Sequence, residues 1–178
     1  MISIVNELNN IIKSEFHESK IGNKVILNES KSVDFLPVTI DFSNVNAFCI
    51  STDKDGLILH PLLEDGVNKT VDFIIFAEDK KGENLFIFSI ECKTNKTSGW
   101  KTQAKAGLVI GHYILGMLEA KLTRTYENVE HRCLLFSLKG EKRRTKERKI
   151  KYEIDKHFNY KFLHKRCGTE LKLSRYLV

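Results

Sequence analysis

The chain has 178 residues, of which 42% are hydrophobic and 29% charged, as in an ordinary globular domain. This composition excludes collagen-like and low-complexity proteins, and no apolar run approaches the roughly 20 residues that span a bilayer. The net charge of +6 is uneven: residues 139–178 hold 14 Lys and Arg against 5 Asp and Glu, whereas residues 1–138 hold 15 against 18. Because polyphosphates attract basic segments, we expect nucleic acid as a partner, although such a segment can also serve only as a solubilising surface.

The cysteines and the N-terminus indicate where the protein works. Its four cysteines are far apart, and the first three lie in apolar segments, which is typical of reduced, buried thiols. The initial segment MISIVNELNN lacks the basic patch and continuous apolar run of a signal peptide. We therefore expect a cytoplasmic protein with no membrane partner.

Residues 2–20 have helical periodicity, with Ile4, Leu8 and Ile11 on one stripe. Glu15 falls on the same stripe, where it either points at the body of the protein or only borders the apolar side chains. Residues 24–60 then contain the runs KVIL, VDFLPVTIDF, NAFCIS and GLILH between polar turns, which indicates an irregular β-rich region. Pro37 indicates that its strand lies at an edge or is interrupted there.

Two nearly continuous apolar segments, residues 71–77 and 84–94, flank a polar turn. They predict a hairpin of central strands that are covered on both faces. Side chains alternate across a strand, so Glu91 and Lys93 share one face while Ile90 and Cys92 share the other.

Residues 101–121 predict a long helix with an apolar stripe and three glycines. Each glycine costs a helix about 1 kcal/mol relative to alanine, so we expect the helix to approach the sheet or a partner closely. The buried strand expected at residues 132–138 implies a right-handed crossover and a parallel strand pair. The stripe is Ala104, Leu108, Leu115 and Leu118, and the glycines are Gly107, Gly111 and Gly116.

Residues 139–151 hold eight basic residues in thirteen, and KIKYEI after them is compatible with another strand. No internal repeat or long polar linker divides the chain. We therefore expect one domain, with a core over about residues 1–138 and a basic C-terminal extension over residues 139–178.

Charged residues interrupt the predicted hairpin at one end. Asp72 begins the first strand, and Glu91 and Lys93 end the second, so an antiparallel pair brings the two acids together. Neighbouring carboxylates repel each other unless a divalent cation lies between them, and their hard oxygen atoms suit Mg²⁺ or Mn²⁺. Such an ion can polarise a phosphate and activate a water, with Lys93 beside it. The alternative is structural: Glu91 and Lys93 form a surface ion pair, and Asp72 caps its strand.

Asp72, followed 19 positions later by Glu91-Cys92-Lys93, resembles the motif of the PD-(D/E)XK nuclease superfamily. The resemblance implies a mixed α/β fold with an αβββαβ core like that of restriction endonucleases. It departs from the family pattern where Val71 replaces the proline before the aspartate, and where Gly107 replaces the tyrosine of some branches. Carried onto this chain, the resemblance implies metal ligation by Asp72, Glu91 and the Cys92 carbonyl, catalysis by Lys93, and supporting roles for Glu15 and Gln103.

The expected function is an Mg²⁺- or Mn²⁺-dependent nuclease acting on DNA in restriction, repair or phage defence. Small members of this superfamily usually act as homodimers or with a partner protein that supplies recognition. A catalytically silent nucleic-acid-binding or assembly module is the alternative, and an interaction protein without nucleic acid is a third. The expected contacts with nucleic acid are Lys96, Trp100, Lys101, Lys142, Arg143, Arg144, Lys146 and Arg148.

Alternatives remain for the role of Trp100 and for the kind of metal site. Trp100 either stacks on a base or packs at the start of the helix. His157, His164 and Cys167 suggest a zinc site, but the sequence offers no fourth ligand at a suitable spacing.

Overall fold

The structure is a computed structural model that describes residues 3–29, 34–52, 70–94, 98–123, 125–140, 150–156 and 159–177. Its described strands form two mixed sheets, ordered β4-β5-β6-β7-β9-β8 and β1-β2-β3-β10. The helical elements are α1 (Ile4–Ile11), η1 (Ser14–Phe16), α2 (Trp100–Leu122) and η2 (Leu173–Arg175). The strands are β1 (Lys20–Ile21), β2 (Lys24–Leu27), β3 (Val38–Asp41), β4 (Asn46–Ser51), β5 (Phe73–Glu78), β6 (Leu85–Lys93), β7 (Val129–Ser137), β8 (Glu153–Asp155), β9 (Tyr160–Arg166) and β10 (Glu170–Lys172). The predicted mixed α/β fold class is confirmed.

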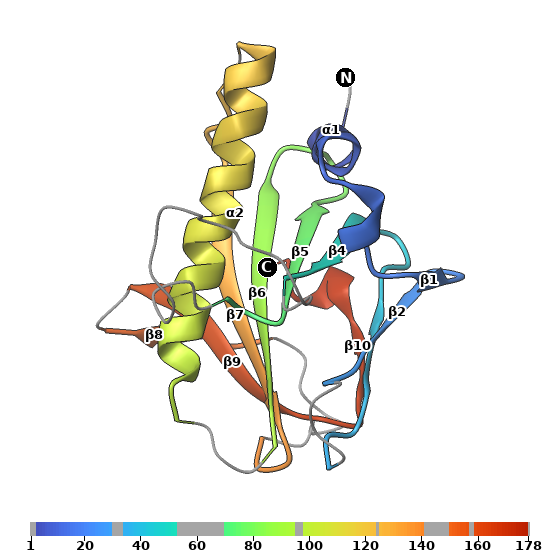
Figure 1. Ribbon diagram of the computed structural model, residues 1–178, viewed down its shortest axis with the longest axis vertical. Coiled ribbons are helices and arrows are strands. Elements are labelled where there is room, and N and C mark those ends of the chain that lie inside the picture. The colour runs from blue at the N-terminus through green and yellow to red at the C-terminus, as the bar shows by residue number, and fades with distance from the viewer. Residues whose placement is uncertain are drawn as a thin grey trace.

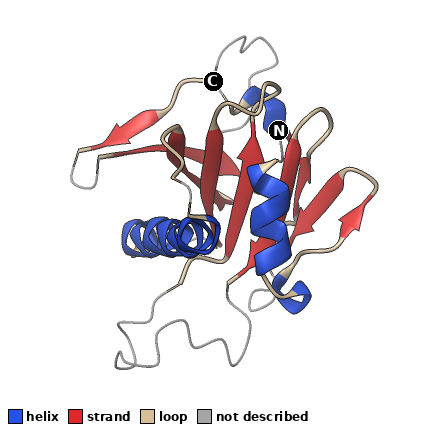
Figure 2. Ribbon diagram, turned by 90° about the horizontal axis from the view of Figure 1, so that it is seen from above, coloured by secondary structure: helices blue, strands red, loops and turns tan. Residues whose placement is uncertain are grey.

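The six-stranded sheet is the middle of three layers. Helices α1 and α2 lie on one of its faces (Figures 1 and 2), where Val5, Leu8 and Leu118 pack against strand residues such as Ile74 and Ile87. Its other face shares a second apolar cluster with β2, β3 and β10 of the smaller sheet. Burial on both faces explains why β5 is apolar along almost its whole length, since every residue of β5 is buried.

The N-terminal helix is shorter than its periodicity predicts. Helix α1 begins at a Ser3 cap, whose Oγ accepts the Asn6 N–H, and it ends at Ile11. The prediction of one helix over residues 2–20 is wrong beyond that point. The chain there joins the large sheet instead, because His17 forms a bridge to Ile50 of β4 and the Glu18 N–H donates to the Cys49 carbonyl. Tertiary strand pairing thus overrides the local helical pattern.

The β-rich region contains three of the expected strands, β2, β3 and β4. Strand β3 starts directly after Pro37, which confirms the expected interruption, but β3 lies between β2 and β10 and is not an edge. The run GLILH lies outside the described residues.

The hairpin and the helix after it confirm the sequence prediction. Strands β5 and β6 pair antiparallel, α2 crosses over the face of the sheet, and β6 pairs with β7 in parallel. A Cβ on Gly107 would lie 2.6 Å from the Ser89 Oγ, and one on Gly111 would lie 2.7 Å from the Ile87 Cγ2. These two glycines therefore permit the close approach of α2 to β6, whereas a Cβ on Gly116 would meet nothing within 4 Å.

The described part of the C-terminal segment is built into both sheets. Strand β9 pairs in parallel with β7, and β10 pairs in parallel with β3. The segment is thus a structural part of the domain and more than the appended extension that its charge suggested. Among the described residues, no helix has the length and apolarity needed to cross a bilayer.

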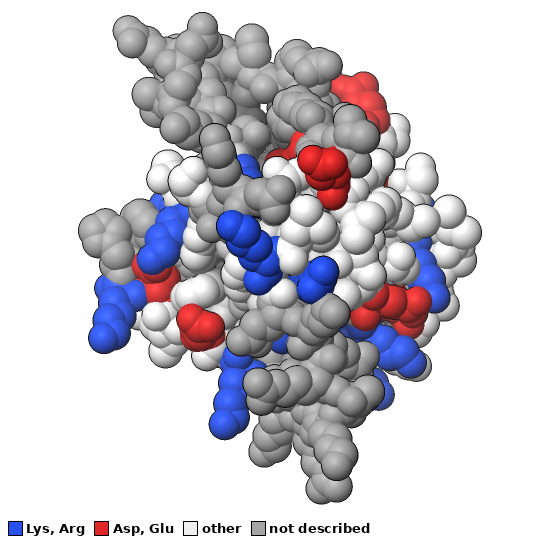
Figure 3. Space-filling model, turned by 90° about the horizontal axis from the view of Figure 1, so that it is seen from below, with Lys and Arg blue, Asp and Glu red and all other residues white. Residues whose placement is uncertain are grey.

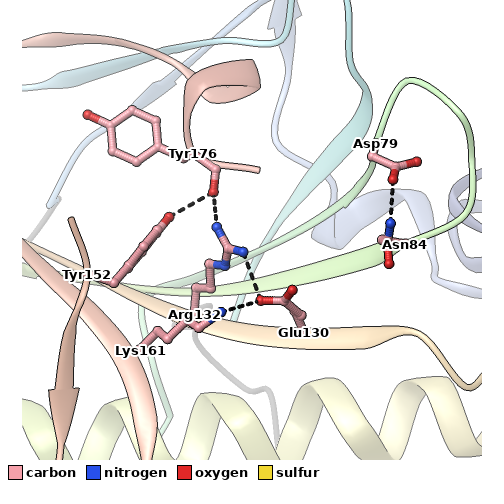
Figure 4. A network of polar contacts seen from close by, with 7 residues as sticks. All are labelled: Asp79, Asn84, Glu130, Arg132, Tyr152, Lys161 and Tyr176. Atoms are coloured by element: carbon pink, nitrogen blue, oxygen red, sulfur yellow. Dashed lines mark hydrogen bonds and ion pairs between the residues drawn. The ribbon is translucent and has the colours of Figure 1, made fainter. Parts of the chain in front are cut away.

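A buried arginine on β7 ties the C-terminus to the large sheet (Figure 4). The Arg132 side chain is almost fully buried, with its guanidinium 4.6 Å from the ring centroids of both Phe86 and Tyr152. It donates to the Tyr176 carbonyl and to the Glu130 carboxylate, the latter at 2.8 Å. This cation is therefore compensated by groups of the protein itself.

Candidate active site

The motif acids meet at one end of the large sheet. Asp72 immediately precedes β5, and Glu91 and Lys93 end β6. Because Phe73 pairs with Ile90, the antiparallel register places Asp72 opposite Glu91. Both acids are buried: Asp72 is 8% exposed and Glu91 is 0% exposed.

The two carboxylates have different surroundings. An Asp72 oxygen, Oδ2, accepts a 2.6 Å hydrogen bond from the backbone N–H of Cys92, the residue after Glu91. Glu91 Oε1 forms an ion pair with the Lys93 ammonium, whereas Oε2 has no hydrogen-bond partner among the described residues. The Lys93 side chain is 21% exposed, so it connects the buried acids with the solvent.

Burial raises the pKa of Glu91 from 4.5 to about 8. The negative charges of Asp72 and Glu29 raise this pKa further, and the Lys93 ammonium opposes them. Burial and the Asp72 charge thus favour the protonated form of the Glu91 carboxyl. A cation placed between Asp72 and Glu91 would remove the same repulsion and would favour the carboxylate instead.

The residues present fit a divalent hard cation. Two carboxylates face each other, and one oxygen of Glu91 is buried with no described hydrogen-bond partner, which is costly unless a proton or an ion binds there. No group of three His, Cys, Asp or Glu side chains suited to a metal occurs among the described residues. A cation at Asp72 and Glu91 would thus keep most of its coordination positions for water or substrate oxygen atoms.

Cys92 contributes main-chain groups and no thiolate. Its side chain lies in the apolar cluster on the opposite face of the sheet from Glu91, as strand alternation predicts. Burial, with the nearby Asp72 charge, raises the pKa of this thiol well above its ordinary value. The prediction that its carbonyl is a metal ligand stays a prediction.

Helix α2 brings Gln103 to the start of β5. The Gln103 Nε2 donates to the Thr70 carbonyl at 3.5 Å, two residues before Asp72. The contact of Gly107 with Ser89 and Val71 holds this part of α2 against the sheet. Gln103 therefore lies near the start of β5, and its supporting role in catalysis stays a prediction.

Glu15 lies on the surface of the molecule, and a different acid, Glu29, acts on Glu91. Glu15 lies in η1 outside α1; its side chain is 65% exposed, and its carboxylate is 3.9 Å from the Lys13 ammonium. Besides Asp72, the acid whose charge raises the pKa of Glu91 is Glu29, which follows β2. Sequence patterns did not indicate Glu29, because its approach depends on how the two sheets pack.

The expected nucleic-acid contacts that the structure describes are Trp100 and Lys101. The Trp100 ring packs on Phe162, with centroids 5.1 Å apart, which favours the packing interpretation of this residue. The Lys101 ammonium lies 2.6 Å from an oxygen of the buried Asp155. Both residues thus hold the start of α2 against β8 and β9. The other expected contacts, Lys96, Lys142, Arg143, Arg144, Lys146 and Arg148, lie outside the described residues.

The alternative zinc site is not assembled from its described members. His164 hydrogen-bonds to Ser137, whereas Cys167 lies in the apolar cluster on the other face of the sheet. His157 lies outside the described residues.

Seen from the end of the sheet where β6 finishes, the molecule carries described cationic and acidic side chains close to one another over the same face (Figure 3). Comparisons with protein-family models, with curated proteins and with solved structures found no match to this chain. A functional assignment therefore depends on the geometry around Asp72, Glu91 and Lys93.

Proposed function

We propose that this protein is a metal-dependent nuclease that hydrolyses phosphodiester bonds in DNA with Mg²⁺ or Mn²⁺. One observation carries the proposal: a fully buried Glu91 faces Asp72 with an oxygen that lacks a described hydrogen-bond partner. A structural carboxylate in this position would be expected to have a neutralising partner for both oxygens. The basic C-terminal segment supports a polyanionic substrate.

Asp72 and Glu91 would hold the cation, which supplies positive charge at the scissile phosphate and lowers the pKa of a water molecule. The Cys92 N–H keeps the Asp72 carboxylate oriented toward Glu91. Lys93 has an ammonium that contacts Glu91 and a side chain that reaches solvent. It can therefore orient the attacking water and stabilise negative charge on the phosphate. Gln103 borders this space and can hold a water or phosphate oxygen.

A silent nucleic-acid-binding module is the second candidate. The observations that favour it are the complete burial of Glu91 and its raised pKa, because a protonated carboxyl can persist without any metal. The two candidates differ in one outcome: the nuclease cuts DNA when Mg²⁺ is added, and the module only binds it.

A cleavage assay tests the proposal. Wild-type protein is incubated with plasmid and with end-labelled single- and double-stranded DNA in Mg²⁺, Mn²⁺ or EDTA. We expect metal-dependent cleavage that Asp72→Asn and Lys93→Ala each reduce at least about 100-fold. Asp79→Asn, at the opposite end of the same hairpin, is the matched control and should retain cleavage.

Cleavage that survives both site variants would place the chemistry elsewhere. Salt-sensitive binding without any cleavage would favour the silent module.

A further inference from the structure

The polar end of β6 continues across the sheet into β7 and β9. These three strands are parallel neighbours, and each ends at the same edge. Their register aligns two rows of side chains: Glu91, Leu135 and His164 in one row, and Lys93, Ser137 and Arg166 in the next.

Both rows lie on the face that α2 covers. Tyr160 and Phe162 of β9 share an apolar cluster with Ala104 and Trp100 of α2. Side chains alternate along a strand, so His164 and Arg166 continue on the same face as Phe162. Since α2 begins at Trp100, which packs on Phe162, the last residues of β9 extend beyond the start of that helix.

Ser137 holds His164 in place. The Ser137 Oγ lies 2.7 Å from the His164 Nε2 and accepts the Lys139 N–H at 3.2 Å. Ser137 is 0% exposed, so its hydroxyl cannot reach a substrate. His164 is only partly buried, and the bond to Ser137 restricts its ring. Ser137 is thus a positioning residue for the imidazole.

Arg166 is a partly buried cation on this edge, and it differs in its partners from the paired lysines nearby. Lys101 pairs with Asp155, and Lys161 pairs with Glu130. No acidic side chain among the described residues pairs with Arg166, although the arginine is partly buried. A partly desolvated guanidinium without a carboxylate is suited to an external anion.

We infer that Arg166 and His164 form a binding site for a backbone phosphate next to the one at which Lys93 acts. This inference rests on the proposed nuclease function. Two strand spacings separate β6 from β9, so this phosphate lies about 10 Å from the position of Glu91. The planar guanidinium of Arg166 can donate two parallel hydrogen bonds to phosphate oxygens. The nearby N-terminus of α2 adds a positive potential that favours an anion.

The contribution of this site is measured by DNA binding under conditions in which no cleavage occurs. Anisotropy of a labelled DNA duplex is measured in EDTA over a series of salt concentrations. We expect Arg166→Ala to weaken binding about 10-fold and to lower the slope of log K against log salt by about 1. Arg166→Gln, which keeps the length of the side chain, gives the same test if the alanine variant does not fold.

Lys161→Ala is the matched control, because Lys161 lies on the same strand with the opposite orientation and pairs with Glu130. It removes one charge as well, yet we expect less than a 2-fold change in affinity. An equal effect of the two substitutions would show that only net charge matters, and it would overturn the site.

The positioning role of Ser137 is tested by a double-mutant cycle. Ser137→Ala and His164→Gln should each weaken binding, and the double variant should be no weaker than His164→Gln alone. Ser137→Thr keeps the hydroxyl and should restore binding. Additive losses would contradict action through His164.

The outcomes separate the two proposals. Weaker binding by Arg166→Ala in a protein that never cleaves DNA supports a binding site for backbone phosphate at Arg166 and rejects the nuclease, together with the placement of this phosphate beside a cleaved one. If neither Arg166→Ala nor His164→Gln changes the cleavage or the binding of DNA, the phosphate site alone is rejected. Absence of any DNA binding by the wild-type protein rejects both.

Discussion

The large sheet buries two charged side chains in contrasting ways. Arg132 of β7 has an acid beside it: it donates to Glu130 and to the Tyr176 carbonyl, it lies between two aromatic rings, and only its Nε has no described partner. Glu91 of the neighbouring strand faces another acid and leaves Oε2 without a hydrogen-bond partner among the described residues. A fold compensates the buried charges that it uses for stability. We therefore interpret Arg132 as structural and Glu91 as reserved for a ligand.

The largest expected effect tests the structural side of this contrast. Arg132→Ala removes a buried cation that donates to the Tyr176 carbonyl and to the Glu130 carboxylate, and it leaves an unfilled space between the Phe86 and Tyr152 rings. We expect the free energy of unfolding to fall by about 4 kcal/mol, measured by urea denaturation. Lys161→Ala removes an exposed cation from the same Glu130 carboxylate and should cost less than about 1 kcal/mol. Equal losses would contradict a structural role specific to Arg132.

The next effect is the pH dependence of the free energy of unfolding, which tests Glu91. Its pKa rises from 4.5 in the unfolded chain to about 8 in the folded protein, so the folded state binds more protons between these values. The free energy of unfolding of metal-free wild type should therefore decrease as the pH rises through this range, by roughly 3 kcal/mol relative to Glu91→Gln.

Urea denaturation of both proteins at pH 5, 6, 7 and 8 in EDTA measures this difference. Added Mg²⁺ should restore stability to wild type at pH 8 and leave Glu91→Gln unchanged. A wild-type protein whose stability rises with pH relative to the variant would contradict the assignment.

A smaller effect concerns helix α2, which excludes water from Asp72 and Glu91. Gly107→Ala places a Cβ 2.6 Å from the Ser89 Oγ and 2.7 Å from the Val71 Cγ1, so α2 must shift away from β6. We expect a loss of about 2 kcal/mol in the free energy of unfolding. The shift should also admit water and lower the pKa of Glu91 toward its ordinary value.

Gly116→Ala is the control on the same helix, since its Cβ meets nothing within 4 Å and alanine favours a helix by about 1 kcal/mol. It should stabilise the protein or leave it unchanged. Destabilisation by both substitutions would mean that the helix tolerates no substitution of its glycines, whatever their contacts.

The sequence predicts best where local pattern and burial agree. The β5–β6 hairpin, α2 and the parallel strand β7 follow from apolar runs and helical spacing, and the glycines of α2 indicate its approach to the sheet. The placement of Asp72 opposite Glu91 follows from the hairpin itself. These features depend on residues close together in the chain.

The rest depends on distant partners. Helix α1 ends early because His17 bridges to β4, and β9 enters the large sheet although its run is basic and only partly apolar. The influence of Glu29 on Glu91 joins a residue after β2 of the small sheet to one on β6 of the large sheet. Ser137 and His164 come together only through the β7–β9 register. No local pattern contains this information.

The most direct test of the account is a crystal of the protein soaked in Mn²⁺ and measured for anomalous scattering. The account predicts one peak between Asp72 and Glu91, about 2.1 Å from a carboxylate oxygen of each, and no such peak in crystals of Glu91→Gln. Manganese bound only elsewhere, or an ordered Glu91 that pairs with Lys93 alone at saturating Mn²⁺, would contradict it.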